Sequence, residues 1–306
     1  MRASTSIVIP TRNGMKTLPG LFDALAAQPG ASDVIVVDSG STDGSAEFAR
    51  TRGARVTRIA PDEFNHGSTR NMAVGQAEGT LVVLLVQDAI PASPSWLCAL
   101  TAPFESDARL AGTYARQTPA AAASALTRWS LRQWQASSPA ARVAGPLTPD
   151  AWASLTPAQR YSACLFDNVC ACIRRDVWGA HPFRVAPIAE DLEWARDVLL
   201  AGYRLAYVPD ALVWHSHERG PWYELQRTWQ VHRRLQELFG LSTVPTRRAL
   251  AAAVARTIPA HARVARREGP AALARAVALG VAWPAGQYLG ARAARTGRPP
   301  RRTRGV

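Results

Sequence analysis

Lysine is almost absent from this sequence: Lys16 is the only one among 306 residues, although arginine is abundant. A Walker A loop needs a lysine after its glycines to reach the phosphates, so the chain has no P-loop of that kind. The pattern G-x-G-x-x-G is also missing after the first expected strand, residues 6–10. Its absence excludes a dinucleotide-binding fold of the usual kind.

Cysteine is scarce as well, and none of the four cysteines belongs to a C-x-x-C pair. We predict that Cys98, Cys164, Cys170 and Cys172 are small reduced thiols in the core, as expected in a cytoplasmic chain. No uncharged apolar run reaches the roughly 18 residues of a membrane-spanning helix. A strand begins almost at the N-terminus, so no signal peptide is expected. The expectation is a soluble cytoplasmic protein, bound at most peripherally to the inner face of the cytoplasmic membrane.

Acidic residues are nearly missing from one end of the chain. Residues 244–306 contain thirteen arginines and one acidic residue, Glu268, and so carry +12 of the formal net charge of +13. Residues 1–243 are nearly neutral, so the basicity says little about a site there. A hydrophobic content of 47% with ten tryptophans indicates a folded protein rather than a disordered one. We predict a main domain over 1–243 and a basic helical extension over 244–306.

An unbroken apolar run follows Thr80 and stops just before Asp88. It predicts a strand buried on both faces, as in a parallel sheet. A second apolar strand, 33–38, ends at Asp38, and helical patterns separate the strands, which predicts a mostly parallel α/β sheet. Ligands bind at the carboxyl ends of such strands, so two carboxylates there indicate a ligand site. The alternative is that each carboxylate only caps a turn.

The segment 64–71, Phe-Asn-His-Gly-Ser-Thr-Arg-Asn, contains a helix start. Asn65 or Ser68 can cap the helix that follows. Free backbone N–H groups at this start, together with Arg70 in the first turn, can bind phosphate. A capped surface helix with a solvated Arg70 is the alternative, and it leaves the density of polar residues in this segment unexplained.

These segments occur in a recognisable order: PTRNG after the first strand, DSGSTDGS after the second, then FNHGSTRN, VQDAIP, EDLEW and VWHSH. Each is weakly specific alone, but the ordered set resembles a family 2 glycosyltransferase of the GT-A fold over about residues 5–240. FNHGSTRN and VQDAIP most resemble the bacterial rhamnosyltransferase-like branch. The resemblance implies a Rossmann-like sheet flanked by helices, with a nucleotide-binding half over 1–90 and an acceptor and catalytic half over 91–243.

The resemblance also implies which residues bind the donor nucleotide. Asp38 matches the family position that contacts the base, and Asp88 matches the second carboxylate of the DxD motif. The nucleotide site would then comprise Pro10, Thr11, Arg12 and Asn13 at the base and ribose, Asp38, then His66, Gly67 and Arg70 at the diphosphate, and Asp88.

The same resemblance implies a divalent cation, Mg²⁺ or Mn²⁺, held by Asp88 against the phosphates. The first DxD position is Val86, which cannot bind a metal, so this sequence departs from the full motif. His215 and His217 stand two residues apart on an extended segment, so their side chains point to the same side and can add metal or phosphate contacts.

An acidic pair, Glu190 and Asp191, begins a helix that Gly202 ends. Acidic residues in a first turn complement the helix dipole, which is a sufficient reason for them taken alone. The resemblance implies that Asp191 is the general base that takes the proton of the acceptor hydroxyl, with Glu190 positioning it. Asp167 and Asn168 resemble the stretch that faces the donor sugar, although a backbone-turn role is equally compatible with them.

The C-terminal extension has an Ala- and Arg-rich helical pattern, with breaks expected at Pro259, at Gly269–Pro270 and at Pro284. A basic amphipathic segment suits an anionic membrane surface. The competing interpretation is a packed helix with a disordered Arg-rich end, and no specific nucleic-acid binding is expected.

We therefore expect an inverting glycosyltransferase in cell-surface polysaccharide synthesis. It would move a sugar, for example rhamnose, from a nucleotide-diphosphate sugar to a saccharide or lipid-linked acceptor. The alternative hypothesis is a catalytically degenerate GT-A domain that binds nucleotide or glycan as an assembly protein. Val86 favours this alternative, whereas Asp191 and the two histidines favour an enzyme.

Overall fold

The computed structural model describes residues 4–29 and 33–297, and the chain divides into two compact units. The first unit comprises Met1–Thr118, Trp134–Ser154 and Ala163–His215. The second comprises Pro119–Gln133, Leu155–Ser162 and Ser216–Val306. The predicted boundary between a main domain and a basic extension at residue 243 rests on the distribution of charge. The two units are defined by packing, so they do not test this boundary, and it stays a prediction.

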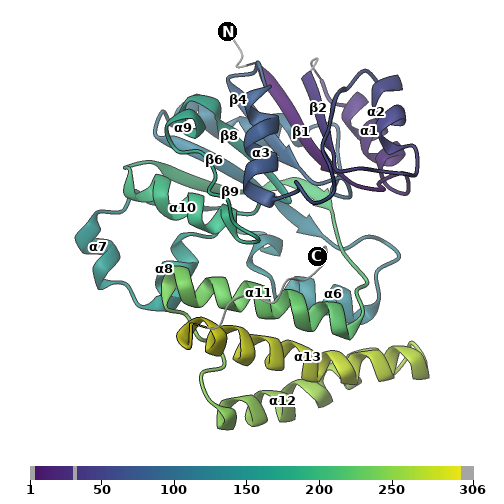
Figure 1. The fold of residues 1–306 in the computed structure, drawn as a ribbon, viewed down its shortest axis with the longest axis vertical. Helices are drawn as coiled ribbons and strands as arrows, with labels where there is room; N and C mark the ends of the chain where they lie inside the picture. The colour runs from purple at the N-terminus through teal and green to yellow at the C-terminus, as the bar shows by residue number, and fades with distance from the viewer. Residues whose placement is uncertain (1–3, 30–32, 298–306) are drawn as a thin grey trace. The chain divides into compact units, whose positions relative to one another are not determined.

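A mixed sheet forms the centre of the first unit (Figure 1). β1 (Thr5–Thr11) pairs in parallel with both β2 (Asp33–Asp38) and β4 (Leu81–Leu85), whereas β8 (Cys170–Arg174) runs antiparallel to β4 and β6 (Leu110–Thr118). Over the described residues the strand order is β3 (Arg55–Arg58), β2 (Asp33–Asp38), β1 (Thr5–Thr11), β4 (Leu81–Leu85), β8 (Cys170–Arg174), β6 (Leu110–Thr118), β9 (Arg204–Trp214) and β5 (Ile90–Pro91), with β7 (Arg142–Ala144) on β9.

The predicted strand before Asp88 is β4, and all five of its residues are buried. The chain passes from β1 outward to β2 and β3 and then returns to β4 on the other side of β1. This reversal is a topological switch point, where the carboxyl ends of adjacent strands leave room for a ligand. The sheet therefore places the loops after β1, β2 and β4 at one edge.

Helices cover the sheet of the first unit, and one of them, α4 (Trp96–Thr101), carries Cys98. Trp96, Leu97 and Leu100 on α4 are buried, whereas Cys98 lies on the opposite side and is exposed. The prediction of a core thiol is therefore wrong for Cys98 and confirmed for the other three cysteines. The helices of this unit are α1 (Leu18–Ala26), α2 (Ser45–Thr51), α3 (His66–Gly75), α4 (Trp96–Thr101), α5 (Pro103–Ser106), α7 (Pro149–Ser154), α9 (Arg175–Ala180) and α10 (Glu190–Leu200), with a 3-10 turn at Gln135–Ser137.

The second unit is helical, and two of its expected breaks are absent. Pro259 lies inside α12 (Arg247–Ala265) and Pro284 inside α13 (Pro270–Arg295), so of the three predicted breaks only Gly269–Pro270 separates two helices. Pro284 lacks the N–H that would bond the carbonyl of Gly280 four residues earlier. The hydroxyl of Thr257 donates to that carbonyl instead, at 2.6 Å, so the helix continues. The helices are α6 (Ala125–Arg132), α8 (Pro157–Ala163), α11 (Pro221–Phe239), α12 (Arg247–Ala265) and α13 (Pro270–Arg295).

Close helix packing in the second unit depends on glycines of α13. A Cβ on Gly280 would lie 3.0 Å from the Cα of Ile258, and one on Gly290 would lie 2.2 Å from the carbonyl oxygen of Trp229. The backbone of α13 therefore lies directly against α12 and α11. Among the described residues, no helix combines the length and the apolarity that crossing a bilayer requires. The Arg-rich end at 298–306 lies outside the described residues, so its predicted disorder stays a prediction.

Candidate active site

The loop after β1 is tied to the loops after β2 and β4. The side-chain amide of Gln87 accepts from the N–H of Arg12 at 2.9 Å and donates to its carbonyl at 3.1 Å. Asn13 has a left-handed backbone, and its side chain accepts from the N–H of Thr42 at 2.9 Å. Thr11 is buried, while Arg12 and Asn13 are exposed. The structure thus brings three predicted nucleotide residues to the switch point and gives Asn13 a role in joining the loops.

Asp38 is completely buried at the carboxyl end of β2. Its Oδ2 accepts from the N–H of Ser41 at 3.1 Å and lies 3.7 Å from Arg58. Its Oδ1 is buried and has no hydrogen-bond partner. An unsatisfied buried acceptor costs about 1–3 kcal/mol, so a ligand donor at this oxygen would be stabilising.

The backbone N–H groups at the start of α3 are less accessible than the sequence predicts. Asn65 is the cap, and its side chain accepts from the N–H groups of Gly67 and Ser68 at 3.0 and 3.2 Å. A Cβ on Gly67 would lie 2.0 Å from the carbonyl oxygen of Arg184, so the backbone of that residue packs onto the helix start. Gly67 therefore serves packing here, and its contact with a diphosphate stays a prediction.

Arg70 is nearly fully buried and forms an ion pair with Glu190, the first residue of α10, at 2.8 Å. The guanidinium also approaches Nδ1 of His66 at 3.3 Å. The alternative of a solvated Arg70 on a surface helix is wrong, because the pair with Glu190 draws the side chain into the protein. Its predicted contact with phosphate is untested by this geometry.

Glu190 and Asp191 are adjacent carboxylates with opposite pKa shifts. Burial alone would raise the pKa of Glu190, but Arg70, His66 and a hydrogen bond from Asn168 outweigh it and hold this pKa below the ordinary value of 4.5. Burial, followed by the negative charges of Glu190 and Asp167, raises the pKa of Asp191 well above 3.8. Asp191 remains partly exposed. Two carboxylates whose environments separate their pKa values can divide acid–base roles between them.

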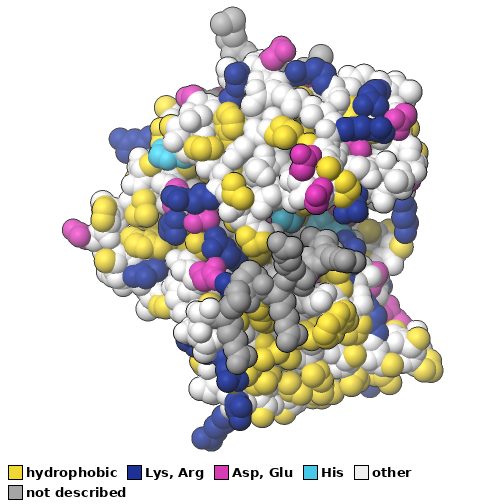
Figure 2. Space-filling view, in the orientation of Figure 1, with side chains coloured by type: hydrophobic (Ala, Val, Ile, Leu, Met, Phe, Trp, Pro, Cys, Tyr) yellow, Lys and Arg dark blue, Asp and Glu magenta, His cyan; other side chains and the backbone are white. Residues whose placement is uncertain are grey.

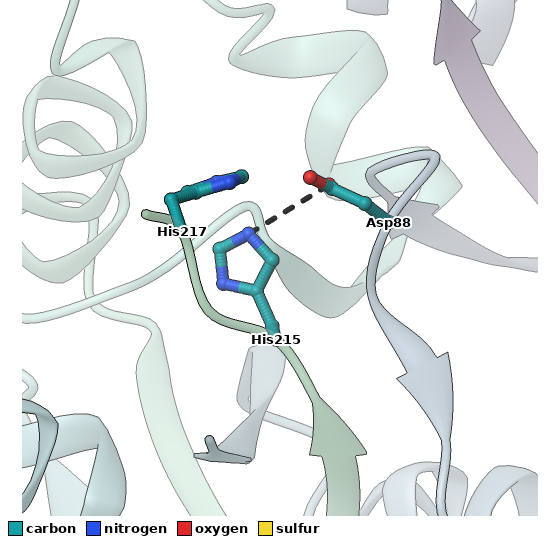
Figure 3. A group of neighbouring side chains, drawn as sticks. All are labelled: Asp88, His215 and His217. Carbon is teal, nitrogen blue, oxygen red and sulfur yellow. Dashed lines mark ion pairs between the residues drawn. The ribbon is translucent and has the colours of Figure 1, made fainter. Parts of the chain in front are cut away.

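Asp88, His215 and His217 converge, as Figure 3 shows. One ligand atom from each lies within 4.8 Å of the others. Nε2 of His215 is 3.7 Å from Oδ1 of Asp88. Ligands sharing one cation lie roughly 2.0–2.3 Å from it and so span about 4–4.5 Å at most. The three side chains have nearly the size and the chemistry of a divalent cation site, and Val86 packs against the core instead.

Gln117 is a polar residue of this region that no sequence pattern indicates as a site residue. It is the second-last residue of β6, is almost fully buried, and contacts both Asp167 and His215. Asn168, the neighbour of Asp167, donates to Glu190 at 3.1 Å. A glutamine near the end of a strand carries no distinctive sequence signal, and its partners here lie 50 and 98 residues away in the chain.

The fold and the cluster at the strand ends define a glycosyltransferase of the GT-A type. The model of the glycosyltransferase-like family 2 matches residues 3–232, and the chain belongs to this family. It is 32% identical to the O-antigen chain rhamnosyltransferase WbaN of Salmonella anatum over 232 residues, which cover 73% of this chain and 70% of that protein. It is 30% identical to the O-antigen chain rhamnosyltransferase RfbN of Salmonella typhimurium over 228 residues, covering 72% and 69%.

Solved structures confirm the fold. The mannosyltransferase PcManGT of Pyrobaculum calidifontis, in complex with GDP-Man and Mn²⁺, superimposes with a TM-score of 0.62 at 19% identity, over 98% of this chain and 89% of that chain. Glucosyl-3-phosphoglycerate synthase of Mycobacterium tuberculosis, in a complex containing Mn²⁺ and UDP, gives a TM-score of 0.53 at 20% identity, over 80% and 84%. The predicted GT-A fold and family are thus confirmed.

Proposed function

We propose that this glycosyltransferase inverts the anomeric centre of a nucleotide-diphosphate sugar and uses Asp191 as general base. The observation that carries the proposal is the arrangement of the acidic pair. Arg70 and Asn168 both donate to Oε1 of Glu190, at 2.8 and 3.1 Å, while Asp191 beside it stays partly exposed, with a pKa that burial raises. A base works best when its pKa lies near the operating pH, and the raised pKa of Asp191 moves it in that direction. Arg70 keeps Glu190 ionised, and this fixed charge in turn favours proton uptake by Asp191.

The donor nucleotide would lie over the ends of β1, β2 and β4. The unpaired Oδ1 of Asp38 is suited to accept from a base N–H. Pro10, Thr11, Arg12 and Asn13 would border the base and ribose, and His66, Gly67 and Arg70 would lie toward the diphosphate. The resemblance supports these roles, and the shared strand edge is compatible with them.

Asp88, His215 and His217 would hold a divalent cation that neutralises the departing nucleoside diphosphate. Two imidazoles and one carboxylate suit Mn²⁺ better than Mg²⁺, because Mg²⁺ prefers oxygen ligands. The proposal therefore includes Mn²⁺ as the favoured ion.

The relatives support rhamnose as the transferred sugar and a saccharide or lipid-linked acceptor in cell-surface polysaccharide synthesis, because both Salmonella proteins are O-antigen chain rhamnosyltransferases. The catalytically degenerate alternative is weakened by the buried support of the acidic pair.

The second unit supports a further partner, an anionic lipid surface. Figure 2 shows hydrophobic side chains gathered over α12 and α13. On α13, Val281 and Leu289 are exposed large apolar residues about two turns apart. Ala274 and Ala278 are exposed on the same side of the helix, in the turns before Val281. The described part of the extension, 244–297, has nine arginines and one glutamate. An exposed apolar stripe in a segment with this excess of positive charge favours anionic headgroups, so we propose peripheral contact with the inner face of the cytoplasmic membrane.

The test of the enzymatic proposal is release of nucleoside diphosphate from a panel of nucleotide sugars, dTDP-rhamnose among them, with Mn²⁺ and an acceptor extract. Asp191→Asn should lower turnover by about 10²–10⁴-fold, as expected for loss of a general base. Asp197→Asn is the matched control, since Asp197 lies on the same helix and pairs with Arg184 on the surface. Full activity of Asp191→Asn would refute the assigned base, and nucleotide binding without turnover on every donor would favour the degenerate domain.

A further inference from the structure

Gln117 links two residues that the sequence places far apart. Its Nε2 donates to Oδ2 of Asp167 at 2.6 Å, and its Oε1 lies 2.9 Å from Nδ1 of His215. The backbone N–H of His215 donates to the carbonyl of Thr118 at 2.9 Å, next to Gln117 on β6. Both the ring and the backbone of His215 are therefore held by the end of this strand.

The directions of these hydrogen bonds determine which ring nitrogen of His215 carries its proton. A carboxylate only accepts, so Asp167 requires the NH₂ group of Gln117 and turns the amide oxygen toward His215. That oxygen also only accepts, so Nδ1 of His215 must be the N–H. A neutral imidazole has a single N–H, which leaves the lone pair on Nε2. Nε2 is the nitrogen that faces Asp88 at 3.7 Å.

We propose that Asp167 and Gln117 are positioning residues that hold His215 in the Nδ1–H tautomer, with Nε2 ready to bind the cation beside Asp88. This inference rests on the proposed metal-dependent transfer and specifies how its site is arranged. Metal-binding histidines commonly donate their second N–H to an oxygen, and the loss of such a partner costs about 10–100-fold in metal affinity.

A turn role alone does not account for Asp167. Its Oδ1 already accepts from the N–H of Val169 at 2.9 Å, which is sufficient to order the turn before β8. Its second oxygen serves Gln117. The adjacent Asn168 donates to Glu190, so a two-residue segment supports the cation ligands on one side and the acidic pair on the other.

Gln117→Leu tests the proposal because it removes both hydrogen bonds at similar side-chain volume. Mn²⁺ binding, measured by the electron paramagnetic resonance signal of free Mn²⁺ in the presence of dTDP, should weaken about 10–100-fold. In ¹⁵N-histidine spectra of the metal-free protein, wild-type His215 should show Nδ1–H alone, and the variant a mixture of tautomers. The signal is assigned by its disappearance in His215→Gln.

A reciprocal pair of substitutions separates positioning from structural damage. In Gln117→Glu with Asp167→Asn, the new amide donates to the new carboxylate, which still accepts from Nδ1, so Mn²⁺ affinity and the single tautomer should return. Gln28→Leu is the control, since Gln28 is a buried glutamine of the same unit with three hydrogen bonds away from the site. It should lower the melting temperature and leave Mn²⁺ affinity unchanged.

Two results would overturn the inference while leaving metal-dependent transfer intact: an Nε2–H tautomer in the wild-type protein that binds Mn²⁺, or unchanged Mn²⁺ affinity in Gln117→Leu. If the wild-type protein binds no Mn²⁺ with any nucleotide, the proposed cation site is wrong, and the role of Gln117 and Asp167 in positioning a metal ligand is lost with it.

Discussion

Arg70 and Glu190 lie 120 residues apart in the sequence and meet as a buried ion pair at 2.8 Å. The pair joins the start of α3 to the start of α10, and so connects the segment predicted to line the diphosphate with the segment that carries the candidate base. Asn168 donates to the same oxygen of Glu190. The charge of Glu190 is thus compensated by two side chains, whereas Asp191 accepts from backbone N–H groups, of Leu192 at 2.8 Å and of Asn168 at 3.5 Å.

Breaking this pair should destabilise the protein strongly. Arg70→Met leaves the charge of Glu190 buried without its cation and should lower the free energy of unfolding by about 3–5 kcal/mol. Arg70→Met combined with Glu190→Met should recover part of the loss, because no unpaired charge remains. Urea denaturation at pH 7.5 measures both.

Arg184→Met is the matched control for Arg70→Met. Arg184 also pairs with an acidic residue of α10, but its side chain is 61% exposed. Its loss should cost at most about 1 kcal/mol. Equal effects of the two substitutions would contradict the assignment of Arg70 to a buried, structurally required pair.

Asp191→Asn should raise stability while it removes activity. A carboxyl group whose pKa is higher in the folded than in the unfolded protein destabilises the fold as the pH rises from the unfolded pKa to the folded pKa. Above the folded pKa this loss of stability is constant. The melting temperature of Asp191→Asn should therefore approach that of the wild type well below pH 3.8 and exceed it at pH 7.5. Scanning calorimetry without nucleotide or metal tests this. A lower melting temperature of the variant at pH 7.5 would show that Asp191 is not destabilised by its surroundings.

Local sequence signals predicted the elements that depend on neighbouring residues. The apolar run before Asp88 is β4, and Asn65 caps α3 as its position in the polar segment indicates. The acidic pair does begin a helix. These features depend on the alternation, spacing and capping chemistry of a few residues in succession.

Features set by distant partners were not predictable in this way. Pro284 was expected to break a helix, and only the packing of Thr257 from α12 shows why it does not. Arg70 was expected near phosphate or solvent, and its partner lies on α10. Gln117 gains its role from two residues far along the chain. In each case a tertiary contact decides what a local pattern leaves open.

Chelation should abolish activity, and Mn²⁺ should restore it better than Mg²⁺, because the proposed site offers two imidazole nitrogens. His215→Ala should weaken Mn²⁺ binding by more than the roughly 10–100-fold typical of losing an outer hydrogen-bond partner. His181→Ala is the control, since that ring packs against Tyr203 away from Asp88. Undiminished turnover in EDTA would contradict a metal-dependent mechanism.

The exposed apolar stripe of α13 predicts binding to anionic vesicles. Val281→Glu with Leu289→Glu should reduce co-sedimentation with phosphatidylserine-containing vesicles at least tenfold, because burying one such side chain contributes about 1.5–3 kcal/mol. Val185→Glu is the control, since among the described residues of the first unit Val185 is the most exposed large apolar one. Equal sedimentation with neutral and anionic vesicles, or no loss in the double variant, would contradict the proposed surface.

Gly67 should tolerate no side chain, and a second glycine of the same helix provides the comparison. In Gly67→Ala the new methyl group would meet the carbonyl of Arg184 at 2.0 Å, so the backbone of one segment must move. Overpacking of this kind costs about 1–3 kcal/mol.

Gly75, at the end of α3, has only an ordinary 3.9 Å contact for an added Cβ, so Gly75→Ala should stabilise the protein by about 0.5–1 kcal/mol. Urea denaturation of both variants measures whether each substitution lowers or raises the free energy of unfolding. A stable Gly67→Ala protein that still binds nucleotide would show that Arg184 does not pack onto the helix start, and would leave the N–H groups there open to a diphosphate.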